Sequence, residues 1–115
     1  RMLQLAKSAI CAGMLTLLEA GGLGAEGPAR LAIAGGFGSF LDLHSAACIG
    51  LYPPALESRA RAIGNAALAG ASMMLLRGQY RQQAAALAEQ AETVDLSASP
   101  VFRENYVECM GFETP

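Results

Sequence analysis

The sequence predicts an α/β fold, a layered unit of about three strands and four to five helices. Apolar residues recur at intervals of three and four in several segments, which is typical of helices. Short apolar runs bounded by Gly or Pro lie between these segments and indicate buried strands. With 115 residues, the chain has room for one such domain, residues 1–115.

The apolar content of the chain comes largely from small side chains. Ala occurs 23 times and Gly 13 times, whereas Leu occurs 16 times and Trp is absent. This composition favours close approach of helices to one another, or of the backbone to a ligand. The net charge of −2 gives no basic surface for nucleic acid or an anionic membrane.

The longest segment free of charged residues and His is 62–76, which is too short to span a bilayer. The three Cys form neither a disulfide framework nor a CxxC motif, so we expect a cytoplasmic protein.

The first half of the chain contains two predicted helices and two predicted strands. Residues 2–20 form an amphipathic helix that ends at a pair of glycines, and 31–34 form a buried strand. Asp42 is expected to cap a short helix over 43–49. A second strand is predicted over 59–63.

The second half is predicted to be mainly helical. Helices are expected over 66–76 and 79–92, and the apolar run 73–76 is expected in the core. A third strand is predicted over 93–96. Ser99 and Pro100 then begin a last helix that extends to about Met110.

The first candidate site is the glycine cluster that follows the strand over 31–34. Gly35, Gly36 and Gly38 lead from that strand towards Asp42 and a helix N-terminus, where backbone N–H groups can meet a phosphate or a ring. Leu41 stands where a dinucleotide-binding fingerprint has its third glycine, and the chain contains no P-loop. The alternative is a tight turn without a ligand.

The second candidate is a row of small residues at helical spacing. Gly64, Ala67, Gly70 and Ala71 leave one helix face nearly bare, against which a flat ligand or another backbone can lie. Close packing of this helix onto the sheet is the preferred interpretation of this pattern.

The third candidate is the polar face of the first helix. Gln4, Lys7, Ser8 and Cys11 lie on one side of it. The alternative is an ordinary solvated face.

His44 and Cys48 stand four residues apart, a spacing that can place two ligands on one metal ion. No third or fourth ligand lies near them in the sequence, so a half-buried His and a core Cys are expected instead. No nucleophile elbow is present, and no catalytic residue is assigned.

Five segments, in consistent order over nearly the whole chain, carry a resemblance to one family. The chain resembles the carboxy-terminal region of the iron–sulfur reductive activators of corrinoid-dependent enzymes, ATPases with an actin-like core of the acetate and sugar kinase, heat-shock chaperone and actin superfamily. The segments are residues 4–13, 31–38, 42–51, 64–71 and 99–108.

The resemblance implies a partial ATP site. Gly35, Gly36 and Phe37, with Gly38 beside them, match the adenosine motif of the superfamily at a strand end. Gly64 and Asn65 match a second glycine turn, for which both nucleotide contact and structural support remain open. The resemblance also implies that the helix carrying Gln4, Lys7 and Ser8 flanks the adenine and ribose.

The resemblance further implies that this chain is the distal part of one lobe of a protein that is longer at its N-terminus. The three Cys lack ferredoxin spacing, so an iron–sulfur cluster is expected only in the missing part. Expected partners are the remainder of the ATPase, a corrinoid protein and a second copy of the chain. Alone, the chain is expected to have little or no ATPase activity. Two alternatives remain: another ATP-using relative, such as a dehydratase activase or small-molecule kinase, or a non-catalytic oligomerisation or docking module.

Overall fold

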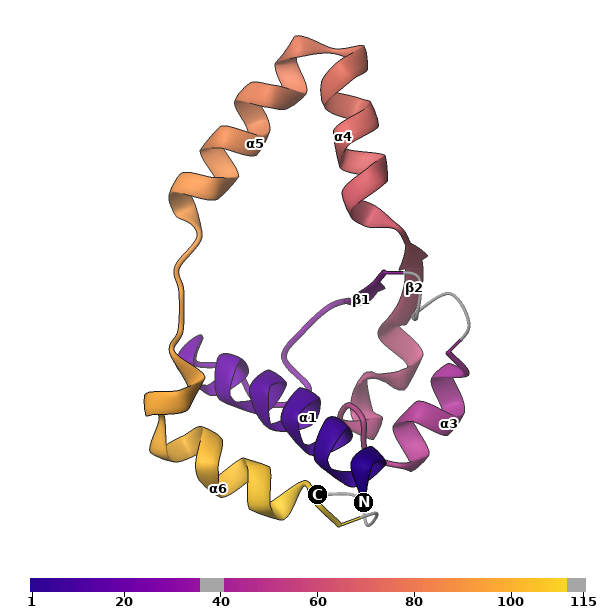
Figure 1. The fold of residues 1–115 in the computed structure, drawn as a ribbon, viewed down its shortest axis with the longest axis vertical. Helices are drawn as coiled ribbons and strands as arrows, with labels where there is room; N and C mark the ends of the chain where they lie inside the picture. The colour runs from indigo at the N-terminus through magenta and orange to yellow at the C-terminus, as the bar shows by residue number, and fades with distance from the viewer. Residues whose placement is uncertain (36–40, 112–115) are drawn as a thin grey trace.

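The computed structural model describes residues 1–35 and 41–111 and shows a helix-rich α/β domain (Figure 1). Its regular elements are α1 (Met2–Ala20), β1 (Leu31–Ala34), α3 (Leu43–Cys48), β2 (Ala60–Gly64), α4 (Ala66–Leu76), α5 (Gly78–Gln90) and α6 (Pro100–Glu108). Two 3₁₀ helices, η1 (Pro54–Arg59) and η2 (Leu96–Ala98), precede β2 and α6 respectively.

Most of the predicted elements are confirmed. The predicted helices over 2–20 and 66–76 and the strand over 31–34 have the observed bounds. Asp42 caps α3 as predicted, because its carboxylate accepts hydrogen bonds from the N–H groups of His44 (3.0 Å) and Ser45 (3.3 Å). The second strand lies one residue later than predicted, since η1 occupies the chain up to Arg59.

The third strand predicted over 93–96 is wrong. Residues 91–95 have no regular structure, and η2 begins at Leu96. The carboxylate of Asp95 accepts hydrogen bonds from the backbone N–H (3.1 Å) and the hydroxyl (2.6 Å) of Ser97, which turns the chain. The predicted three-stranded layer is therefore reduced, within the described residues, to two strands.

The two strands form a parallel sheet. Leu31 pairs with Ala60 and Ile33 with Ala62, and an irregularity between Ile33 and Ala34 then brings Ala34 opposite Gly64. Parallel strands end at the same edge of a sheet, so Gly35 after β1 and Gly64 at the end of β2 lie together.

The core lies in two clusters that both involve α1. On one side, Met14 packs against a cluster that joins α3, η1 and the start of β2. On the other side, Cys11 and Ala12 pack against Cys109 at the end of α6. The buried residues of the first cluster are Ala46, Ala47, Tyr52, Leu56 and Ala60.

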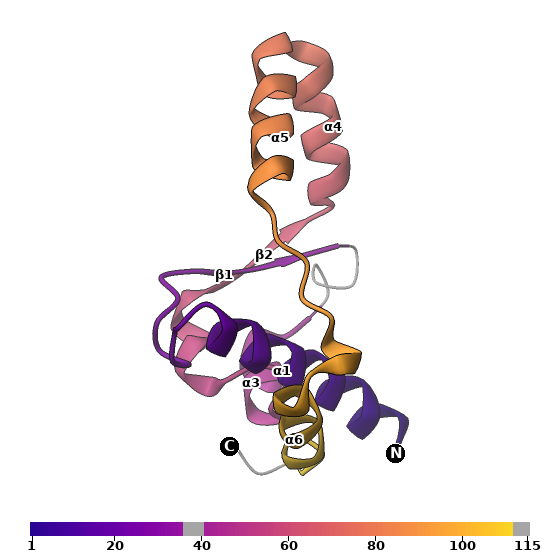
Figure 2. The same ribbon diagram turned by 90° about the vertical axis from the view of Figure 1, so that its left-hand side faces the viewer.

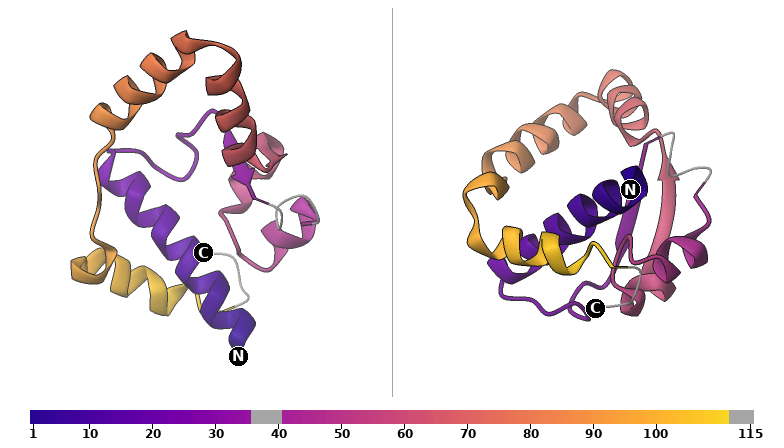
Figure 3. Two further views of the ribbon diagram at one scale, coloured as in Figure 1. Left: turned by 45° about the horizontal axis from the view of Figure 1, so that its top comes forward. Right: turned by 60° about the horizontal axis from the view of Figure 1, so that its bottom comes forward.

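The helices α1 and α6 lie side by side although they come from opposite ends of the sequence (Figures 1 and 3). Among the helices described, α1 alone is long and apolar enough to cross a membrane by length and composition. Its polar residues Lys7, Ser8 and Thr16 are nevertheless buried within the domain. About a third of α1 (33%) is buried within the domain.

The helices α4 and α5 form a hairpin that extends away from the sheet (Figures 1 and 2). The prediction that 73–76 lies in the core is wrong, since Leu75 and Leu76 are about four-fifths exposed (79% and 81%). The preferred interpretation of the small-residue face, packing onto the sheet, is also wrong. Gly70 instead lines a shallow groove with Tyr80 and Ala84 of α5.

Candidate functional site

Gly35 and Gly64, one residue from each predicted glycine turn, meet at the carboxyl edge of the sheet. The backbone N–H of Gly35 donates a hydrogen bond of 2.7 Å to the carbonyl of Gly64. Both glycines have positive φ angles, +100° at Gly35 and +67° at Gly64. Because residues with a Cβ are strained in this region, glycine is the residue that both turns require.

The helix α4 begins directly after the second turn. The side-chain oxygen of Asn65 accepts a hydrogen bond of 3.0 Å from the N–H of Leu68 and so caps this helix. Ligands of open α/β sheets bind beyond the carboxyl ends of the strands, where loop glycines and helix N-termini come together. Gly35, Gly64 and Asn65 form such an edge.

Three of the predicted site residues, Gly36, Phe37 and Gly38, lie outside the described residues.

Two of the predicted site residues on α1, Gln4 and Lys7, form hydrogen bonds with the segment that follows α6. Gln4 donates a hydrogen bond of 3.3 Å to the carbonyl of Met110, and the Lys7 ammonium donates one of 2.6 Å to the carbonyl of Cys109. Lys7 also donates to the carbonyl of Gly111. Within the part of the chain that the structure describes, the buried Ser8 Oγ has no hydrogen-bond partner.

The alternative of a solvated face on α1 is wrong, because Lys7, Ser8 and Cys11 are all buried. The structure thus brings Gly35 and Gly64 to one place and ties Gln4 and Lys7 to the segment that follows α6.

Cys11 is fully buried beside Cys109. Burial, and then a hydrogen bond to the Cys109 thiol, raise the pKa of Cys11 to about 12. Cys11 is therefore an un-ionised thiol at neutral pH and an inert part of the core.

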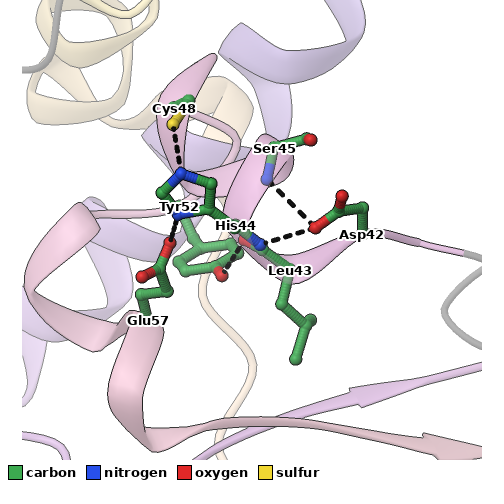
Figure 4. Close-up of polar contacts among 7 residues, drawn as sticks. All are labelled: Asp42, Leu43, His44, Ser45, Cys48, Tyr52 and Glu57. Carbon is green, nitrogen blue, oxygen red and sulfur yellow. Dashed lines mark hydrogen bonds and ion pairs between the residues drawn. The ribbon is translucent and has the colours of Figure 1, made fainter.

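His44, Cys48 and Glu57 form a second polar cluster, on the surface (Figure 4). His44 Nδ1 lies 2.7 Å from a carboxylate oxygen of Glu57, and His44 Nε2 lies 3.6 Å from the Sγ of Cys48. The expectation of a half-buried His and a core Cys is wrong, because both residues are exposed. Sequence reasoning missed Glu57, since it lies on η1, 13 residues from His44, and no periodicity links the two.

The ranges 1–35 and 41–111 contain no group of three His, Cys, Asp or Glu side chains placed to hold a metal ion.

A cavity of about 210 Å³ lies between α1 and β1. Tyr52 supplies a hydroxyl to its otherwise apolar side-chain lining, but that group already donates a hydrogen bond of 2.6 Å to the carbonyl of Leu43. The other lining residues are Ile10, Met14, Leu31, Ile33, Ala34, Leu41 and Leu51. The lining includes Ala34, the last residue of β1, so the cavity adjoins the strand that leads to Gly35.

The small parallel sheet and the helices around it form a mixed, helix-rich α/β domain that is consistent with an ASKHA-type domain. The chain belongs to the family described as the C-terminal domain of RACo, the ASKHA domain, whose family model matches residues 1–114. The family resemblance predicted from the sequence is thereby confirmed.

The chain is also similar to the corrinoid activation enzyme RamQ of Eubacterium limosum. The two are 36% identical over 107 residues, which cover 93% of this chain and 18% of the relative. The chain thus spans about a fifth of the length of the relative that it matches.

Proposed function

We propose that this chain forms the adenosine side of the nucleotide site in an ATPase that reductively activates a corrinoid protein. The observation that carries the proposal is the contact between Gly35 and Gly64, which joins two glycine turns from distant parts of the sequence at one sheet edge. The N-terminus of the eleven-residue helix α4 follows directly. Such an edge suits a nucleoside, because the backbone can approach the ligand without side chains in between.

Family membership and the relative support the corrinoid part of the proposal. The family is an ASKHA domain, and the relative is described as a corrinoid activation enzyme. The chain corresponds to only 18% of that relative, so the activity belongs to a longer protein in this proposal. The phosphates, magnesium and the iron–sulfur cluster that supplies the electron are then held outside these 115 residues.

The assignment of Gln4, Lys7 and Ser8 to the adenine and ribose rests on the resemblance alone. In the structure, Gln4 and Lys7 already bond to carbonyls of residues 109–111. We therefore propose the glycine edge of Gly35, Gly64 and Asn65 as the primary contact, and we propose Gly36, Phe37 and Gly38 as further contacts on the basis of the resemblance alone.

Three glycine-to-valine variants of the full-length protein test the proposal. Gly35→Val and Gly64→Val place a branched side chain at the glycine edge, and Gly36→Val tests the next residue of the proposed adenosine motif. The measurements are ATP affinity by calorimetry and ATP-dependent reduction of the cobalt(II) corrinoid, followed by absorbance. A loss of roughly tenfold or more in ATP affinity is expected if the backbone must touch the nucleoside.

Gly22→Val is the matched control. Gly22 follows α1 and also has a positive φ angle (+73°), and a Cβ there would meet no atom within 4 Å, so this variant introduces the same backbone strain away from the glycine edge. Far-UV circular dichroism and the thermal midpoint identify variants that have simply unfolded. Folded valine variants that retain normal ATP affinity would overturn the assignment of the glycine edge.

The other ATP-using relatives remain the second candidate, and the name of the 36% identical relative favours the corrinoid activators over them. ATP binding without any effect on corrinoid reduction would favour a dehydratase activase or a kinase. If this chain is a non-catalytic docking module, the folded glycine variants of the full-length protein would keep the ATP affinity of the wild type.

A further inference from the structure

The His44 imidazole joins the Cys48 thiol to the Glu57 carboxylate in a surface array that the proposed ATPase function does not use (Figure 4). His44 and Cys48 come from α3, one helical turn apart, and Glu57 comes from η1. The array is accessible, since the His44 side chain is 76% exposed and that of Glu57 39% exposed.

The carboxylate fixes which nitrogen of His44 carries the proton. A carboxylate only accepts hydrogen bonds, so a neutral His44 donates to it from Nδ1–H. The lone pair of Nε2 then faces the Cys48 Sγ at 3.6 Å. Cys48 is thus placed as a nucleophile, His44 as its base, and Glu57 as the group that orients the base.

The local helix does not itself favour a thiolate. Cys48 is the last residue of α3, where the helix dipole disfavours negative charge. The Cys48 thiolate is therefore stabilised by the imidazolium that forms when His44 takes its proton. The Glu57 carboxylate stabilises this imidazolium in turn.

We propose that Cys48 is a modifiable thiol that undergoes exchange with low-molecular-weight disulfides, with His44 as its base and Glu57 as the positioning residue. His44 Nε2 takes the thiol proton, and the Cys48 thiolate attacks one sulfur of the disulfide. A new S–S bond forms, the original S–S bond breaks, and the departing thiolate takes the proton from His44. One disulfide and one thiol are consumed and one of each is formed, so no external oxidant is needed.

The experiment incubates the full-length protein, reduced and in the presence of a chelator, with oxidised glutathione at neutral pH. Trypsin separates the three cysteines of this chain, because Lys7, Arg30, Arg59 and Arg103 lie between or beside them. Mass spectrometry then gives the rate of mixed-disulfide formation at each cysteine. The chelator excludes a bound metal ion as the cause of any change in rate.

Cys48 is expected to react roughly tenfold faster in the folded protein than in the urea-unfolded protein. Cys11 and Cys109 are expected to react more slowly when folded, because they are buried. His44→Gln is expected to bring the Cys48 rate down to that of the unfolded chain, and Glu57→Gln to bring it part of the way. Glu89→Gln, an exposed carboxylate on α5, is the matched control and is expected to change nothing.

Three results would overturn the proposal: a folded rate at Cys48 no higher than the unfolded rate, an unchanged rate in His44→Gln, or an equal loss in Glu89→Gln. Circular dichroism of each variant confirms that its fold is retained. The proposal does not depend on the nucleotide site, so its failure leaves the proposed ATPase function untouched.

Discussion

The Lys7 ammonium lies 2.6 Å from the carbonyl oxygen of Cys109, 102 residues further along the chain. Lys7 is 1% exposed and also donates to the carbonyl of Gly111. A buried ammonium is costly unless it is hydrogen-bonded, and these backbone carbonyls satisfy it. Lys7 thus joins α1 to the segment after α6.

Lys7→Met is expected to lower the free energy of unfolding by about 1–3 kcal/mol, because buried hydrogen bonds to a charged group are lost. Urea unfolding measures this loss. Gln82→Met, at an exposed position on α5, is the control and is expected to be neutral. An unchanged unfolding midpoint in Lys7→Met would show that the methionine offsets the lost hydrogen bonds.

Stability is expected to fall with rising pH between about 9 and about 12 because of Cys11. Its pKa rises from 9.0 to about 12 in the folded chain, mainly through burial. Its contribution to stability is therefore complete below pH 9 and disappears as the pH rises towards 12. Denaturant unfolding across this range should show a shallower fall for Cys11→Ala. Leu76→Ala, which removes an exposed side chain that does not titrate, should keep the wild-type slope.

Two leucine substitutions are expected to have very different effects. Leu56→Ala should cost about 2–5 kcal/mol, because Leu56 is 1% exposed and its loss leaves a cavity. Leu76→Ala should stay within about 0.5 kcal/mol, since Leu76 is 81% exposed. Denaturant unfolding of the 115-residue chain gives both values. A large cost at Leu76 would mean that the α4–α5 hairpin is covered by another chain.

The stability of α4 is expected to respond in opposite directions to two changes. Asn65→Ala removes the side-chain oxygen that accepts a hydrogen bond from the N–H of Leu68, and should lower the stability of α4 by about 1 kcal/mol. Gly70→Ala should gain about 0.5–1 kcal/mol, because glycine is a poor helix former and a Cβ there meets no neighbour. Amide hydrogen exchange along α4 measures both. Equal protection in the two variants would contradict the capping geometry.

The sequence predicts individual elements of this fold better than their burial. The helix over 2–20 and the strand over 31–34 follow from local periodicity and flanking glycines, and both have the expected bounds. The strand expected over 93–96 fails because a strand needs a neighbour to pair with, and Asp95 turns the chain instead. Leu75 and Leu76 fit a core pattern, yet burial depends on what packs against α4, which local periodicity does not specify.

For the candidate site, too, the sequence identifies the residues but not how they come together. The glycines at 35 and 64 stand out in the sequence, but the pairing of their turns follows from the parallel register of β1 and β2. The face of α1 that carries Lys7 was also visible from spacing. What covers that face was not, because the segment that follows α6 is about a hundred residues away.

The long separation between α1 and α6 has a consequence for how this domain folds. The entropic cost of closing a loop grows with its length, and contacts between distant residues slow folding. During synthesis, α1 emerges long before α6, so its buried face with Lys7, Ser8 and Cys11 has no partner helix until α6 has been made. Ribosome-bound chains that end before Pro100 should therefore leave Cys11 open to thiol reagents. Protection of this cysteine should appear only as the last helix clears the exit tunnel.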